Sequence, residues 1–161
     1  MLFRSLFTLS AFHNACADLI EGLATGDLNA DADLARGFWE ALASQFPIWG
    51  QVRSGRLPAG EVREGFIHSH GIALQAIARA GNTLLHKHPN DWRKRLAAIG
   101  KIDWSRSNAA LWEGRALIGG KVSKSSTNVT LTCNVVKESL RLPLEPEEEK
   151  VEKAYKKRSK A

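Results

Sequence analysis

The sequence predicts an all-α protein: a single-domain helical bundle of about six to seven helices with a long central helix. Apolar residues recur at spacings of three and four along most of the chain, which is typical of helices with one buried face. Glycine and proline separate these segments and mark the helix ends. The chain has 161 residues, of which 43% are apolar and 25% charged, so it can form one domain with a real core.

The first helix is expected from about residue 3 to residue 23. Its apolar stripe keeps helical spacing throughout: Leu2, Leu6, Leu9, Phe12, Cys16, Ile20 and Leu23. The same segment faintly resembles a secretory signal with a possible cleavage site at residues 15–17. His13 and Asn14 interrupt the apolar run, however, and the stripe continues past residue 17. A core-facing helix is therefore favoured.

The second helix is expected to start after a cap at Asp31 or Asp33, to run through residue 46 and to stop at Pro47. A loop is expected over residues 48–56. Pro58 then suits the first turn of a long central helix, where its missing N–H costs nothing, and this helix extends to about residue 85. Small residues line it, so a neighbouring helix could approach closely: Gly65, Ser69, Gly71, Ala73, Ala76, Ala80 and Gly81.

Shorter helices are expected after this central one. Residues 92–99 predict a short basic helix, and residues 107–118 predict another that breaks at the Gly119-Gly120 pair. Residues 129–133 alternate like a strand, but Val129 and the apolar residues after it hold helical spacing. Because Ser125 and the polar residues that follow supply helix-capping groups, a helix over 127–141 is favoured.

The last segment predicts a charged helix over residues 146–158. Glutamates stand at its start and lysine and arginine at its end, an order that complements the helix dipole. No composition shift divides the chain. The expected organisation is one helical domain over residues 1–161, within which residues 145–161 form a charged terminal helix and basic tail.

Charge is spread unevenly. The net charge is +6; residues 1–60 carry four basic and six acidic groups, whereas residues 86–126 carry nine basic and three acidic groups. This excess favours a polyanionic partner for the second half. The two cysteines, Cys16 and Cys133, form no CxxC motif, which is typical of a reduced, cytoplasmic protein. No segment is long and apolar enough to suggest a membrane span.

Double-stranded DNA is the polyanion that the pattern favours. The helices at 107–118 and 127–141 are arranged somewhat like a helix-turn-helix, although their connection of about eight residues is longer than usual. The expected DNA contacts are basic or small hydroxyl and amide side chains: Arg93, Lys94, Arg106, Arg115, Lys121, Ser123, Lys124, Asn128 and Thr130. Trp92, Trp104 and Trp112 could stack on bases, but their spacing favours a core position for Trp104 and Trp112.

Catalytic, metal and cofactor sites have little support. Glu61, Glu64 and His68 could share one helix face, but no second group at ligand spacing accompanies them, so no metal site is expected. Gly114 and Gly119 have the separation of a phosphate loop, but Gly120 stands where the lysine belongs. No nucleophile motif is present either. We therefore expect no enzyme activity and no cofactor.

Six stretches of the sequence resemble the DndB family, the DGQHR-domain proteins of bacterial DNA phosphorothioate (sulfur) modification systems. They cover nearly the whole chain: residues 4–10, 66–76, 101–116, 119–125, 128–132 and 142–148. The similarity is to the C-terminal half of that family. The Asp-Gly-Gln-His-Arg motif belongs to an N-terminal half that we expect to lie outside this chain.

The resemblance implies a DNA-binding transcriptional regulator, mainly a repressor, which acts on the promoter of its own modification gene cluster. Such a cluster belongs to an antiphage defence system that marks the host's DNA. The resemblance implies no sulfur-transfer chemistry for this chain, and it assigns no base-reading residue to any position here.

An alternative function is that of a non-catalytic interaction or assembly module of the same system, without DNA contact of its own. In that case the small-residue helix over 60–85 and the N-terminal apolar stripe would stay partly exposed. They would bind the missing N-terminal half or a second copy of the chain.

Overall fold

A computed structural model describes residues 6–161, and these residues confirm the all-α class. In chain order the α-helices are α1 (Leu9–Ile20), α2 (Leu28–Ala43), α3 (Pro47–Arg53), α4 (Ala59–Gly65), α5 (Gly71–Lys87), α6 (Trp92–Leu96), α7 (Ala109–Trp112), α8 (Ser126–Ser139) and α9 (Pro146–Ser159). Two short 3₁₀ helices are η1 (Ile67–Ser69) and η2 (Ala97–Lys101), and a small hairpin pairs β1 (Leu117–Ile118) with β2 (Lys121–Val122).

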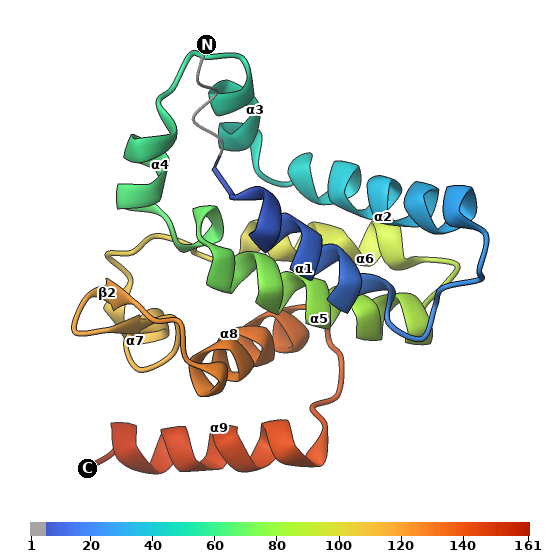
Figure 1. Cartoon of the computed structure of the whole chain (residues 1–161). Helices are drawn as coiled ribbons and strands as arrows, with labels where there is room; N and C mark the ends of the chain where they lie inside the picture. Colours follow the sequence, from blue (N-terminus) through green and yellow to red (C-terminus); the bar gives the residue numbers. More distant parts are fainter. Residues whose placement is uncertain (1–5) are drawn as a thin grey trace.

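Helix α5 is the central helix, as the sequence predicted. It packs against α1 on one side and α8 on another, so the three helices form the middle of the bundle (Figure 1). Its buried residues include Ala73, Ala76, Ile77 and Leu84, all fully enclosed. The small-residue face that the alternative function left exposed is therefore covered by helices of this chain.

A helix begins directly after Pro58, as expected, but the predicted long helix is divided between residues 65 and 71. The backbone is extended at Phe66 and again at His70, and η1 lies between them. Tertiary hydrogen bonds replace the helical ones here: Ile67 N donates to Trp104 O at 2.8 Å, and Arg106 N donates to Gly65 O at 2.9 Å. Helical periodicity carries no signal for hydrogen bonds to a distant segment, so this break could not be predicted from the sequence pattern.

Two further expectations were wrong. Residues 48–56 are not all loop, because α3 begins at Pro47, in the position where proline's missing N–H is harmless. The helix expected over 107–118 is only the single turn α7, followed by the β1–β2 hairpin. Gly114 ends it with a φ of +79° and lies so close to the Tyr155 ring that an added Cβ would stand 2.8 Å from Cε2. With α3 and the division of the long helix, the described residues hold nine α-helices.

Other predicted elements are confirmed, with shifted ends. The segment around residues 129–133, for which the sequence allowed a strand or a helix, is part of helix α8. Helix α9 matches its predicted range. Asp27 caps α2 in place of Asp31, whose carboxylate accepts from Thr25 instead. Helix α1 begins at Leu9 after a Thr8 cap, and the part of the predicted helix over residues 3–5 lies outside the described residues. None of the helices in residues 6–161 is long and apolar enough to cross a membrane.

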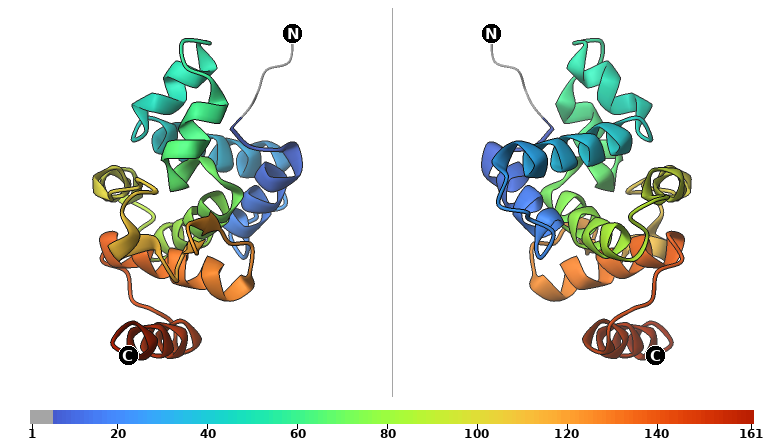
Figure 2. Two further views of the ribbon diagram at one scale, coloured as in Figure 1. Left: turned by 90° about the vertical axis from the view of Figure 1, so that its left-hand side faces the viewer. Right: turned by 90° about the vertical axis from the view of Figure 1, so that its right-hand side faces the viewer.

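Helix α9 is attached to the bundle by polar contacts and not by packing of apolar side chains. Within residues 6–161, the two clusters of buried apolar side chains include no residue of α9. The helix lies along the outside of α8, apart from the rest of the bundle (Figure 2). Polar contacts hold it: Lys137 Nζ lies 2.8 Å from both oxygens of Glu148, and Arg115 pairs with Glu152.

The tightest helix crossing predicts one stability effect. An added Cβ at Gly81 would stand 2.8 Å from Phe38 Cε2 and 3.0 Å from Leu19 Cδ1. We expect Gly81→Ala to lower the free energy of unfolding by about 1–3 kcal/mol in urea denaturation, because a filled core resists an extra methyl group. Gly50→Ala is the control: Gly50 lies within α3 with nothing near an added Cβ, so its replacement should be neutral or stabilise by up to about 1 kcal/mol. Equal effects of the two changes would contradict this account of the crossing.

Candidate nucleic-acid interface

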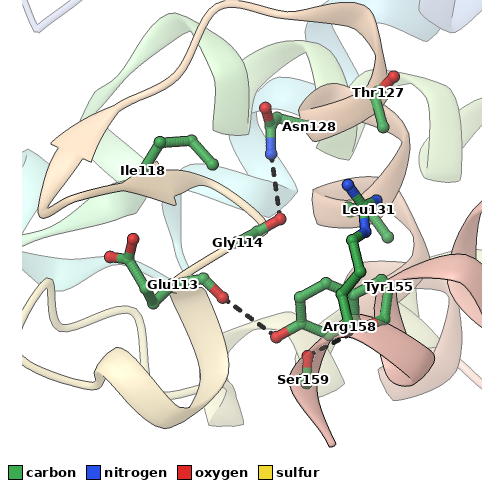
Figure 3. A pocket seen from close by; sticks show the side chains of 9 residues that line it. All are labelled: Glu113, Gly114, Ile118, Thr127, Asn128, Leu131, Tyr155, Arg158 and Ser159. Atoms are coloured by element: carbon green, nitrogen blue, oxygen red, sulfur yellow. Dashed lines mark hydrogen bonds between the residues drawn. The ribbon is translucent and has the colours of Figure 1, made fainter. Parts of the chain in front are cut away.

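Three elements far apart in the sequence meet at one end of the molecule. The β1–β2 hairpin, the first turn of α8 and the last turn of α9 lie together at the left of Figure 1. A pocket of about 480 Å³ lies between them. Its lining residues are drawn in Figure 3: Glu113, Gly114, Ile118, Thr127, Asn128, Leu131, Tyr155, Arg158 and Ser159.

The first turn of α8 is held in place by a polar network around the buried Asn128. Ser125 caps the helix by accepting from Asn128 N at 3.2 Å. The Asn128 side chain accepts from Ser123 Oγ at 2.7 Å and donates to Gly114 O at 3.1 Å, which ties the helix start to the hairpin. The amides of Ser126 and Thr127 belong to the first turn, where a helix has no acceptor of its own, and both residues are exposed. This end of α8 therefore carries open donors and the positive end of the helix dipole.

Arg158 brings a positive charge from α9 to this helix start. Figure 3 shows its side chain reaching across the pocket towards α8. The last turn of α9 is fixed beside the pocket, since Tyr155 Oη donates to Glu113 O at 3.1 Å. Sequence reasoning missed Arg158, because the basic end of this helix was explained by the helix dipole alone. Its approach to α8 follows from tertiary packing, and no local signal in the sequence indicates it.

The hairpin supplies two lysines. Lys121 on β2 and Lys124 just before α8 are both exposed, and no ion pair within residues 6–161 holds either ammonium group. Gly119 and Gly120 make the turn with φ of +58° and +74°. Their amides donate to the Glu113 carboxylate, so the acidic group that lines the pocket is already engaged. The lysines remain free to meet an anion.

Arg115 was assigned to DNA wrongly. It is only 8% exposed, and its guanidinium donates to the two Glu152 oxygens at 2.8 and 2.6 Å. It also stacks over the Tyr155 ring, 4.2 Å from the centroid. Although burial alone would raise it, the hydrogen bonds from Arg115 and Asn134 hold the pKa of the Glu152 carboxyl below its ordinary value. Arg115 therefore holds α9 in place and cannot reach a phosphate outside the protein.

The other expected contacts fall into three groups. Ser123, Asn128 and Thr130 bond within the chain; Asn128 is buried, and Thr130 Oγ1 donates to Ser126 O at 3.1 Å. These three shape the helix start and do not present free groups. Arg93 and Lys94 are exposed on α6, at the opposite end of the bundle from the hairpin (Figure 1).

Arg106 lies on the other side of the hairpin turn. It is half-buried and donates to Gly120 O at 2.9 Å and to Arg63 O at 3.2 Å. Part of its guanidinium is thus used to hold the turn against α4.

The helix-turn-helix expectation is contradicted. Helix α8 is buried along most of its length, between α5 and α9, so its side cannot lie in a DNA groove. Its first turn faces solvent, and of its other residues only Glu138 near its end is exposed. The core position of Trp104 and Trp112 is confirmed: they are 4% and 0% exposed and stack with ring centroids 5.1 Å apart. Trp92 is buried as well, beneath the Arg93 guanidinium.

His68 is a core residue. It is 4% exposed, its Nδ1 accepts from Trp49 Nε1 at 3.0 Å, and it stacks between the rings of Phe46 and Phe66. Burial lowers the pKa of His68 to about 4. No three histidine, cysteine, aspartate or glutamate side chains in residues 6–161 lie close enough together to hold a metal ion.

His68 predicts a pH dependence of stability. Its folded pKa of about 4 lies below the ordinary 6.5, so the unfolded chain binds the proton more readily. The contribution of neutral His68 to the free energy of unfolding is complete above about pH 6.5. It should be lost as the pH falls towards 4, and the loss should total about 3 kcal/mol. His68→Gln keeps an acceptor for Trp49 and should flatten this part of the curve in urea denaturation at each pH. The exposed His13→Gln variant should leave the curve unchanged; an unflattened curve for His68→Gln would refute the assignment.

The buried ion pair predicts a second effect. Arg115→Met leaves the Glu152 carboxylate without its partner, so we expect the free energy of unfolding to fall by about 3–5 kcal/mol. The double variant Arg115→Met/Glu152→Met removes both charges and should recover much of that loss. Lys150→Met, which breaks an exposed pair with Glu147, should change stability by less than about 0.5 kcal/mol. An Arg115→Met protein as stable as the parent would show that the pair contributes little.

Comparison with known proteins identifies the family. Residues 3–143 match the family DndB, described as DNA-sulfur modification-associated. No curated protein and no solved structure matches the chain in the same comparison. The matched region includes the hairpin and all of α8, and α9 follows it. Since the match covers most of its 161 residues, the chain belongs to the DndB family of DNA-sulfur modification-associated proteins.

Proposed function

We propose that this chain is a DNA-binding transcriptional regulator, a repressor, of a bacterial DNA phosphorothioate modification gene cluster. Its ligand would be double-stranded DNA from the promoter of that cluster, and it would act in the cytoplasm. Family membership supports a role in DNA sulfur modification. The DNA contact rests on the end of the molecule formed by the hairpin, α8 and α9.

One observation carries the proposal. The first turn of α8, Lys121, Lys124 and Arg158 gather at one end of the molecule, and Glu113, the acidic side chain in the pocket, is engaged by the hairpin amides. A helix start binds anions because its amides point outwards and its dipole is positive there. Lysine and arginine add the charge that attracts a phosphate backbone. The arrangement suits phosphate contact better than base reading, since the side of α8 is covered and cannot enter a groove.

We propose no catalysis for this chain. The residues around the pocket include no nucleophile with a base beside it, and phosphate contact needs none. Backbone contacts position a protein on DNA without selecting a sequence. A preference for its own promoter would then come from DNA shape or from a further part of the assembly.

The alternative, an assembly module without DNA contact, loses its main surface in this fold. It required the small-residue face of the central helix and the N-terminal apolar stripe to be partly open. Helices α1 and α8 cover that face, whereas Leu9 and Phe12 of the stripe stay exposed. The assembly-module function would become the favoured one if the chain bound no DNA.

The charge-removal variant Lys121→Ala/Lys124→Ala/Arg158→Ala tests the proposal. We expect its affinity for a promoter duplex to fall roughly tenfold or more in fluorescence anisotropy at low salt. The slope of log affinity against log salt should become shallower by about two to three, because each phosphate that is no longer neutralised removes about 0.9 from the slope. Helicity measured by circular dichroism should stay the same, since these side chains are exposed or line a pocket.

A variant at the other end of the bundle is the matched control. Lys87→Ala/Arg93→Ala/Lys94→Ala removes the same number of charges from the end of α5 and from α6. We expect it to keep most of the affinity. The reverse result, with α6 and not the hairpin end controlling affinity, would place the interface at Arg93 and Lys94. Unchanged binding in both variants, or no DNA binding by the parent chain, would contradict the proposal.

A further inference from the structure

Two arginines and a histidine meet at the start of α5, on the far side of the hairpin turn from the pocket. Arg63 comes from α4, His70 precedes α5, and Arg106 comes from the segment before α7. His70 and Arg106 converge on the Arg63 backbone: His70 Nε2 lies 2.7 Å from Arg63 O, and Arg106 Nη1 donates to the same oxygen at 3.2 Å. Sequence reasoning named only Arg106 as a contact.

No carboxylate balances this cluster. Within residues 6–161, no ion pair involves Arg63, His70 or Arg106. Burial and the charges of the two arginines lower the pKa of His70, whereas its contact with the Arg63 carbonyl acts the other way. Like charges held together without a counterion favour binding of an anion, which relieves their repulsion.

The cluster also has donors to spare. Arg63 Nη1 makes both of that side chain's hydrogen bonds, to Leu6 O at 2.7 Å and to Ser69 O at 3.0 Å, so its Nε and Nη2 are open. Arg106 Nε is an open donor as well. Within residues 6–161, none of these nitrogens is among the fully buried polar atoms without a partner, and their residues are partly exposed. The carbonyl bonds fix the side chains and leave these nitrogens without a protein partner.

We propose that Arg63, His70 and Arg106 form a phosphate-binding site at the start of α5. Two guanidinium groups held by backbone bonds present the planar donors that suit phosphate oxygens. Helix α5 begins next to His70 without a side-chain cap, so its first amides add donors beside the cluster. This deepens the proposed function: Arg106 also bonds Gly120, next to Lys121, so one DNA backbone could pass from the pocket across the hairpin to this site. The site itself does not depend on DNA being the carrier, because free phosphate offers the same oxygens.

His70 gives a direct readout. In its neutral form Nε2 carries the proton that is donated to Arg63 O, so Nδ1 is left as an acceptor facing solvent. A bound phosphate favours a proton on Nδ1 and should raise the pKa of His70 from its lowered value. The charged groups that act on His70 are Arg63 and Arg106.

The experiment is NMR of the full chain labelled at histidine, with two arms. Inorganic phosphate is titrated in one arm and a promoter duplex in the other, at constant pH and ionic strength. We expect the His70 ring signals to move towards the protonated form while the exposed His13 stays unchanged. A response to phosphate alone assigns the site to a free phosphate, and a response to the duplex assigns it to the DNA backbone. Unchanged His70 ring signals in both titrations would overturn the proposed site. This result would hold even if the Lys121, Lys124 and Arg158 variant confirmed DNA binding at the hairpin end.

Two substitutions separate binding from folding. Arg106→Gln removes a charged donor. It should lower the affinity for phosphate or the duplex, whichever shifts His70, roughly tenfold, which is the cost of one charge-assisted hydrogen bond. The exposed Arg36→Gln should leave that affinity unchanged. Because Arg106 also holds the hairpin turn, His70→Gln is the second variant: glutamine can still donate to Arg63 O, but it cannot titrate. It should remove the tightening of duplex binding that protonation of His70 causes as the pH is lowered, while helicity is retained. Unaltered affinity in Arg106→Gln together with an unaltered pH profile in His70→Gln would overturn the site.

Discussion

The buried ion pair between Arg115 and Glu152 is the contact on which the candidate interface depends. It joins the hairpin to α9, and Asn134 of α8 donates to the same carboxylate at 3.1 Å. Removing both charges from water is costly, and the bidentate geometry with its extra donors offsets that cost. Without this pair nothing in the apolar core would place α9, and Arg158 would not stand opposite the start of α8.

The polar network around the buried Asn128 complements this ion pair. It fixes the first turn of α8 to Gly114, while the ion pair fixes α9 to the same stretch of chain. Residues 113–117 therefore act as the common support for both sides of the pocket. Rigidity matters here, because an anion site gains most when its donors are already in place before the ligand arrives.

The sequence predicted the parts of this molecule whose signals are local. Helices α8 and α9 follow from periodicity, capping residues and charge order, and the basic excess indicated the half of the chain that holds the candidate site. The break at Phe66 was hidden, because its cause is hydrogen bonding to residues about 40 positions away. The prediction for Arg115 was wrong for the same reason. An arginine in a basic segment is expected to contact a ligand unless its protein partner is known, and that partner, Glu152, lies 37 residues further along the chain. Arg158, Arg63 and His70 were missed because the fold, not their spacing, makes them neighbours.

The docking of α9 through charged groups has a consequence for how the protein opens. A helix that buries little apolar surface contributes little to the heat capacity of unfolding or to its denaturant sensitivity, both of which scale with exposed area. Its detachment would therefore leave almost no trace in a global melting curve. Such a helix belongs to the low-stability end of a structure, where segments open on their own while the core stays closed. The assembled form of the anion-facing pocket would thus depend on the buried charge pairs that attach α9, and not on the hydrophobic core around α5.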